Sequence, residues 1–241
     1  MANRYFDNSQ LAEAIHIASG DTKGVSHINK FGATDGDVTA GTIWDGNAAA
    51  VTYPYPANSV VAITSDAADS GDNGKAVLVE GLDASFHAVS ETINVASTGS
   101  TVFSRIFRAR MVDTNNDADV SLTMGGTVAA KIIEDKAQTL MAVYTVPAGK
   151  TGYLLKLQMG SDKASTNAAL KYTLMARDTD NGNVFQIKGI SYAAGGQSVV
   201  VEYPVPLKFE EQTDIRVDVI ASSGGQTCSA TFDLILVDNR S

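Results

Sequence analysis

Apolar and polar residues alternate over short stretches of this chain, and turn-forming residues separate the stretches. In the segment AVYTVPAGKTGYLLKLQ, residues 142–158, two apolar runs flank a Val-Pro-Ala-Gly turn. Pro147 presets the backbone for a tight turn, and Gly149 can take the left-handed conformation that closes it. The segment therefore predicts a β-hairpin with one apolar side. The residues expected to share that side are Tyr153, Leu155 and Leu157.

Similar runs recur from about residue 47 to the end of the chain, at the spacing of roughly 8 to 15 residues that is typical of a sandwich or jelly roll. Residues 177–187 form another expected hairpin, because Asn181-Gly182 supplies positive φ at its turn. We therefore predict an all-β fold with two β-sandwich domains (jelly-roll or Ig-like) in series. Their expected ranges are residues 46–135 and 136–241.

Residues 1–45 differ from the rest of the chain. Ser9 is placed to cap a short helix that ends at Gly20, and a glycine-rich stretch follows with Trp44 as its aromatic anchor. An extended segment without a core of its own must pack on its own domain or on a neighbouring copy. We therefore expect an N-terminal arm over residues 1–45 that carries a short helix.

Composition places the chain among folded globular proteins, because 44% of its 241 residues are hydrophobic and 19% are charged. The formal net charge of −9 would repel the phosphates of nucleic acid, so nucleic-acid binding is not expected. Three arginines, Arg105, Arg108 and Arg110, lie on mixed faces of an expected strand and indicate solvated charges. Cys228 is the single cysteine, which excludes an intramolecular disulfide and favours a buried small apolar side chain.

No run of the chain has the length and apolar character of a membrane span, and the N-terminus does not resemble a signal peptide. We therefore expect no membrane partner and synthesis in the cytoplasm.

One stretch resembles a metal loop. Asp113, Asn115, Asp117 and Asp119 alternate as in the first half of a helical calcium loop. However, Ala118 stands where that loop needs glycine, and Met124 stands where it needs a bidentate glutamate. A solvated turn is the favoured interpretation, both here and for the acidic loop at residues 66–74. No metal ligand is therefore predicted.

The sequence contains no motif that would bring catalytic residues together. The histidines, His16, His27 and His87, lie far apart, and no Gly-x-Ser-x-Gly motif nominates a nucleophile. The Gly-Lys-Thr triplet at residues 149–151 is not a phosphate loop, because Tyr144 stands where the first glycine would be. We predict no catalytic residue, no cofactor and no enzymatic activity. A polymer-degrading enzyme would need two converging carboxylates, and the sequence nominates none.

Aromatic residues near the end of the arm allow two interpretations. Trp44, Tyr53 and Tyr55 could present stacking faces to a sugar, or they could anchor the arm against the first domain. The anchor is the favoured interpretation, and a glycan-binding face stays open as the alternative.

The order of several motifs resembles a group of virion structural proteins of tailed bacteriophages. The motifs are HINKFG, IWDG, a Tyr-Pro stretch, VLVEGLD, SETINV, SRIFRARMV and QTLMAVYTVPAGKTGYLLKLQ. The resemblance covers most of residues 27–158 and is looser beyond them. At residues 47–49 this chain has Asn-Ala-Ala where further glycines usually follow the WDG motif.

The resemblance implies a non-enzymatic virion component, most simply a capsid decoration or cement protein. Such a protein binds the outer shell in many copies, so the expected partners are the major capsid protein and further copies of the chain, with a trimer favoured. The alternative is a receptor-binding or fibre-associated adhesin. The residues of the arm expected to make assembly contacts are Ile28, Phe31, Ile43 and Trp44, with packing inside the same subunit equally open.

Overall fold

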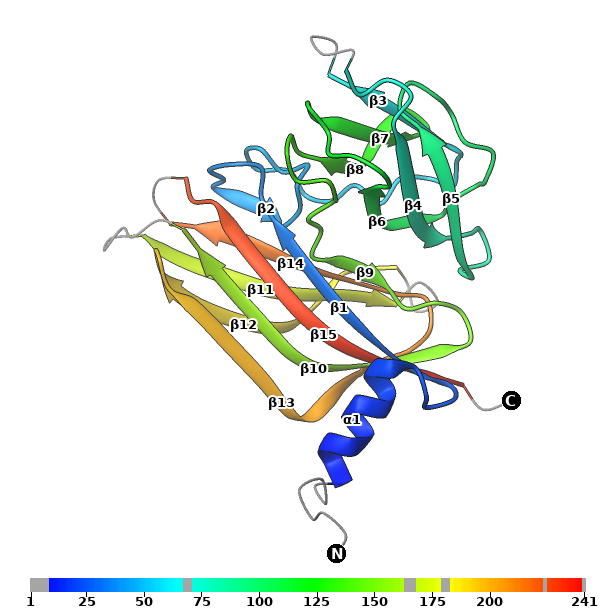
Figure 1. The fold of residues 1–241 in the computed structure, drawn as a ribbon. Coiled ribbons are helices and arrows are strands. Elements are labelled where there is room, and N and C mark those ends of the chain that lie inside the picture. The colour runs from blue at the N-terminus through cyan, green and yellow to red at the C-terminus, as the bar shows by residue number, and fades with distance from the viewer. Residues whose placement is uncertain (1–8, 67–70, 163–167, 179–182, 223–224, 240–241) are drawn as a thin grey trace, which may run out of the picture.

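The computed structural model describes residues 9–66, 71–162, 168–178, 183–222 and 225–239. The fold is all-β apart from one short helix near the N-terminus, α1 (Ser9–Ser19), and its strands pair antiparallel in several sheets (Figure 1). The predicted all-β class and the short helix are thus confirmed.

Two long sheets form what we call the larger unit. The four-stranded sheet has the order β1 (Val25–Ala33), β15 (Cys228–Asp238), β10 (Lys150–Ser161) and β13 (Ser198–Phe209). The five-stranded sheet has the order β12 (Gln186–Ala194), β11 (Ala169–Asp178), β14 (Thr213–Ala221) and β2 (Ala40–Thr42), and β9 (Val143–Thr145) also pairs with β14. Buried side chains from both sheets form one hydrophobic cluster.

Two three-stranded sheets form what we call the smaller unit, which lies above the larger one in Figure 1. One sheet has the order β3 (Val61–Ser65), β7 (Val120–Met124) and β8 (Thr127–Ile132). The other has the order β5 (Ala88–Asn94), β4 (Ala76–Leu82) and β6 (Arg105–Met111). A second hydrophobic cluster fills this unit. Along the chain the smaller unit falls between β2 and β9, so two stretches of the larger unit enclose it.

Part of the expected N-terminal arm lies within the larger unit. β1 pairs with β15 along its whole length, from Val25 opposite Val237 to Ala33 opposite Ser229. β2 pairs with β14 in the other sheet. Helix α1 projects from the end of β1 and is largely exposed (Figure 1). Residues 25–42 therefore pack on strands of their own chain.

The hairpin predicted at residues 142–158 is wrong, although the turn itself is present. Gly149 has φ of 73°, and the N–H of Lys150 donates to the carbonyl of Pro147 at 3.3 Å. However, β9 pairs with β14, whereas β10 pairs with β15 and β13. Turn residues specify a reversal of the chain but not its partner strand, and here the turn carries the chain from one sheet to the other.

The predicted apolar side of β10 is also wrong, because a β-bulge interrupts the alternation. The register of β10 shifts between Leu154 and Lys156 against both of its neighbours. As a result Leu154 and Leu157 are buried, while Leu155 is 36% exposed. A bulge adds one residue to a strand and so moves the following side chains to the opposite face.

The second predicted hairpin is consistent with the pairing of its strands, since β11 and β12 are antiparallel neighbours. Its Asn181-Gly182 turn lies outside the described residues.

The close approach of β1 to the segment before β9 gives a testable prediction. A Cβ at Gly32 would lie 2.2 Å from the backbone nitrogen of Ala142 and 2.8 Å from the carbonyl oxygen of Ile43. We expect Gly32→Ala to lower the free energy of unfolding by about 3 kcal/mol, because backbone atoms must move apart. Gly160→Ala is the control, since its Cβ would meet Ser198 at 3.4 Å. Equal urea midpoints for the two variants would contradict this account.

Candidate functional site

Three aromatic residues lie where the two units meet. The rings of Trp44 and Tyr53 are each only 2% exposed and make an edge-to-face contact at 5.1 Å. Tyr53 also contacts Tyr55 edge-to-face at 4.7 Å, and its hydroxyl donates to the carbonyl of Ala129 at 3.0 Å. Neither Trp44 nor Tyr53 offers an open face on which a sugar could stack. This packing agrees with the interpretation that these residues anchor their segment against the rest of the chain.

Tyr55 belongs to a longer stack in which aromatic rings and guanidinium groups alternate. The members of this arginine–aromatic stack are, in order, Phe86, Arg105, Tyr55, Arg177, Phe185 and Arg216. Each guanidinium carbon lies 4.0 to 5.4 Å from a neighbouring ring centroid. Such cation–π contacts are strongest where water is excluded. The stack begins on the smaller unit and ends on the outer face of the five-stranded sheet.

Asp214 of β14 joins the two units through this stack. Its carboxylate is 0% exposed and accepts hydrogen bonds from Arg105 Nε at 2.8 Å and Arg105 Nη2 at 3.0 Å. Arg177 Nε donates to it at 2.7 Å, and the Thr145 hydroxyl donates at 2.5 Å. Because Arg105 lies on β6 and Asp214 on β14, this bidentate pair ties the smaller unit to the larger one.

Burial alone would lower the pKa of Arg105, but the hydrogen bonds to Asp214 and the charge of its carboxylate raise it. The expectation of solvated arginines is therefore wrong for Arg105, whose side chain is 11% exposed. It holds for Arg108, which is 47% exposed. The carboxylate of Asp214 is occupied by four protein donors, so this arrangement is suited to holding two units in place.

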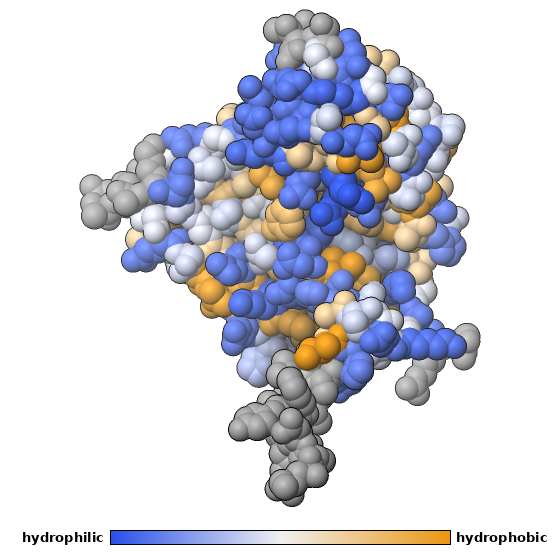
Figure 2. Space-filling model, viewed as in Figure 1, coloured by the Kyte–Doolittle hydropathy of each residue, from blue (hydrophilic) through white to orange (hydrophobic). Residues whose placement is uncertain are grey.

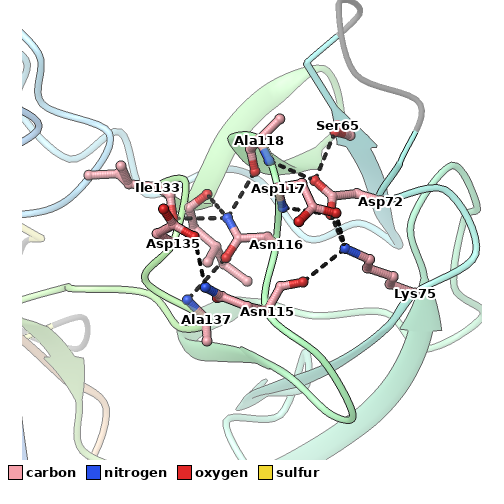
Figure 3. A network of polar contacts seen from close by, with 11 residues as sticks. Ser65, Asp72, Lys75, Asn115, Asn116, Asp117, Ala118, Ile133, Asp135 and Ala137 are labelled. Atoms are coloured by element: carbon pink, nitrogen blue, oxygen red, sulfur yellow. Dashed lines mark hydrogen bonds and ion pairs between the residues drawn. The ribbon is translucent and has the colours of Figure 1, made fainter.

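The two acidic loops singled out in the sequence meet in the smaller unit (Figure 3). The carboxylate of Asp72 is fully buried and accepts the N–H groups of Asp117 at 2.9 Å and Ala118 at 3.0 Å. The Lys75 ammonium donates to Asp72 at 2.8 Å, to the Asn115 carbonyl at 2.9 Å and to the Asp117 carboxylate. All three N–H groups of the ammonium are thus satisfied by oxygen atoms.

This ammonium lies between oxygen atoms that could otherwise surround a cation. Within the described ranges, no group of three or more His, Cys, Asp or Glu residues could hold a metal ion. Nearby, Lys131 bridges Asp35 at 2.6 Å and Asp119 at 2.7 Å, which links the loop after β1 to the smaller unit. The loops are thus held by two lysines.

The predicted assembly residues fall into two groups. Ile43 and Trp44 are 0% and 2% exposed and belong to the two hydrophobic clusters of their own chain. They offer no surface to a second chain in this conformation. Ile28 and Phe31 are half-buried on β1, so part of each side chain is accessible.

Cys228 is buried, as predicted, and burial raises the pKa of its thiol to about 11.

Sequence reasoning did not single out an exposed apolar row on the five-stranded sheet. Register places four apolar side chains on its outer face. Tyr192 and Ile220 both flank Lys171, Ile190 lies opposite Thr173, and Ile187 lies opposite Met175 beyond a register shift. The members of this outer apolar row are Ile187, Ile190, Tyr192 and Ile220, which are 55%, 45%, 69% and 52% exposed. The smaller unit covers one end of the same face through the arginine–aromatic stack, and the row lies on the part left open.

On the side of the molecule drawn in Figure 2, hydrophilic residues cover much of both units, and hydrophobic residues form separate patches between them. No helix in the described part of the chain has the length and apolar character needed to cross a membrane.

Comparison with known proteins gives no family. No protein-family model and no curated protein matches the chain. Among solved structures, that of the Gx strain of infectious bursal disease virus matches with a TM-score of 0.27 and 10% identity, covering 90% of this chain and 73% of that chain. The VP2 subviral particle of the same virus matches with a TM-score of 0.24 and 9% identity, and the match covers 91% of this chain and 77% of that chain. This similarity to viral capsid structures is weak and does not establish a shared fold.

The buried pair at the junction of the units gives a second prediction. In Asp214→Asn the guanidinium groups of Arg105 and Arg177 would stay buried without their carboxylate. We expect the free energy of unfolding to fall by about 3 kcal/mol or more, the usual effect of removing one partner of a buried ion pair. Urea unfolding measures it. Asp218→Asn is the control, because Asp218 is 20% exposed; a loss as large in the control would contradict a special role for Asp214.

A third prediction concerns the acidic loops. Burial alone would raise the pKa of Asp72, but Lys75 and the two backbone N–H groups hold it below its ordinary value of 3.8. Its stabilising effect is therefore present above pH 3.8 and is lost as the pH falls through its lower folded-state pKa. We expect Asp72→Asn to lower the free energy of unfolding by about 2 kcal/mol at pH 7. The difference from the native protein should shrink in acid.

Asp113→Asn is the matched control, because Asp113 is an exposed residue of the same loop. The free energy of unfolding of both variants is measured from about pH 2.5 to about pH 7, a range that includes the pH at which aspartates titrate. A difference for Asp72→Asn that stayed constant with pH would show that its charge is not what stabilises the loops.

Proposed function

We propose that this chain is a non-enzymatic structural protein of a virion, most specifically a capsid decoration or cement protein. In this proposal it binds the major capsid protein in many copies on the outer shell and stabilises contacts between neighbouring capsomers. The bacteriophage assignment rests on the order of motifs from HINKFG to VPAGKT. The chain needs no cofactor for this function, since contact alone performs it.

The observation that carries the proposal is the outer apolar row. Four large apolar side chains, each about half exposed or more, share one face of a regular sheet. Large apolar side chains exposed together on one face favour a protein interaction site, and here only side chains of β11 such as Lys171 lie between the members on β12 and β14. Flat sheet faces suit repeated contacts, and many modest contacts on a symmetric lattice add up to tight binding.

Attachment of the two units to each other supports the same function. A protein that bridges neighbours must keep its contact surfaces at a fixed distance, and the Arg105–Asp214 pair holds the units together. We infer that each unit is a β-sandwich domain. Since β1 and β2 pair with strands after residue 143, the second domain would also include residues 25–42.

Binding to shells gives a fourth prediction. Purified protein mixed with capsids that lack it should co-sediment with them, and Ile190→Lys should reduce the bound amount at least tenfold, since a charge would be buried in the contact. Val102→Lys is the matched control, because Ile190 and Val102 are both 45% exposed and Val102 lies on the smaller unit. Absence of co-sedimentation at high protein excess would contradict the capsid assignment.

Self-association gives a fifth prediction. We propose a homotrimer in which Ile28 and Phe31 of β1 can contribute contacts, because part of each side chain is accessible. Light scattering of the purified protein should therefore give three times the chain mass of 25.2 kDa. A single-chain mass at micromolar concentration would remove the trimer from the account without affecting attachment to the shell.

A further inference from the structure

A crevice of ≈190 Å³ opens between β1 of the larger unit and strands β4 and β6 of the smaller unit. Both polar and apolar side chains line it. The lining residues that matter here are His27, Lys30, Glu80, Arg108, Thr139 and Tyr144. The crevice is separate from the Asp214 junction and from the outer apolar row.

Lys30 is the unusual member of this crevice. Its side chain is 7% exposed, its ammonium donates to the carbonyl of Phe107, and it lies 5.8 Å from the centroid of the Phe107 ring. An ammonium has three N–H donors, and this carbonyl can accept one of them. Across the described residues, no ion pair includes Lys30. A buried charge without a counter-ion is costly, so an anion in the crevice would stabilise it.

Two carboxyl groups lie near enough to act on the charge of Lys30, but neither forms an ion pair with it in the described part of the chain. Burial, and then the nearby charge of Arg108, lower the pKa of Lys30 to about 7, although the carboxyl groups of Asp45 and Glu80 act in the opposite direction. Asp45 is itself fully buried, which raises its pKa well above the ordinary value and favours its neutral form. Glu80 lies 4.0 Å from Arg108 and is 36% exposed.

The remaining polar neighbours are a histidine and a hydroxyl. His27 lies 3.2 Å from the carboxylate of Asp233, at the outer side of β1. The Thr139 hydroxyl accepts the N–H of Ala109 at 3.0 Å and keeps its own hydrogen to donate. The crevice thus combines a buried ammonium, a guanidinium and a hydroxyl donor in a space of small-molecule size.

We propose that this crevice binds one carboxylate group, with the Lys30 ammonium as its main partner and Arg108 at its rim. The carboxylate could come from a free small carboxylic acid or from an acidic side chain of a neighbouring protein. This site does not depend on the proposed function, because the same residues would bind a carboxylate wherever the protein resides.

Binding should depend on pH in a defined direction. The carboxylate pairs with the protonated amine, so its binding raises the pKa of Lys30 and takes up a proton when the amine is neutral. Affinity is therefore expected to be highest below about pH 7 and to weaken about tenfold for each pH unit above it.

The test is a titration of the full-length, ¹⁵N-labelled protein followed by the amide signals of Phe107 and Arg108. Three probes are compared with chloride at equal ionic strength: acetate, N-acetylglutamate amide and the neutral N-acetylglutamine amide. We expect acetate to shift these signals with saturation, at least tenfold more weakly at pH 8.5 than at pH 6. If the glutamate probe also binds and the glutamine probe does not, the site accepts acidic side chains. If acetate alone binds, the ligand is a free small acid.

Lys30→Met removes the ammonium and should abolish the saturable shifts, whereas Lys188→Met, at an exposed lysine of β12, should leave them unchanged. The pH dependence of the native protein tests the proposal even if Lys30→Met fails to fold. Absence of saturable shifts with any carboxylate, an affinity that does not change with pH, or unchanged binding in a folded Lys30→Met variant would overturn the proposal.

Discussion

The buried carboxylate of Asp214 is the central tie between the two units of this protein, and the Lys131 pair with the loop after β1 and the anchoring aromatic rings add to it. The Asp214 carboxylate accepts hydrogen bonds from two nitrogen atoms of Arg105 on the smaller unit and from one of Arg177 in its own sheet, while Tyr55 lies between the two guanidinium groups. The same guanidinium groups therefore pair with the carboxylate and stack on aromatic rings. The rings bury these groups, and the carboxylate accepts their hydrogen bonds. The smaller unit is also inserted between β2 and β9, so both of its ends are fixed in the larger unit.

Much of the fold could be predicted from the sequence because local rules determine it. Alternating apolar residues and turn residues identified an all-β chain, and the short helix begins at Ser9 and ends at Ser19, close to the expected limits. Such local rules do not determine which strands pair with each other. β9 pairs with β14 about 70 residues away along the chain, and the bulge near Leu154 shifts a face that strict alternation would assign otherwise.

In the candidate sites, too, local features could be predicted from the sequence, whereas contacts between distant residues could not. Burial of Cys228 and the anchoring aromatic residues followed from their local patterns. The pairing of Arg105 with Asp214 spans 109 residues, and no spacing in the sequence indicates it. Lys75 likewise joins two acidic loops that look like separate turns in the sequence. The outer apolar row could have been found in part, since Ile190 and Tyr192 alternate, but which face of β12 is covered depends on tertiary packing.

In the proposed function the protein acts by contact, through its two joined units, an open apolar sheet face and a partly accessible strand near the N-terminus. The most direct measurement is an electron cryomicroscopy reconstruction of purified virions that carry this chain. The account predicts density for it in many symmetric copies on the outer shell, with the outer face of β12, β11 and β14 against a neighbouring chain. Density confined to a tail or fibre, or an outer apolar row that faces solvent in every copy, would contradict the account.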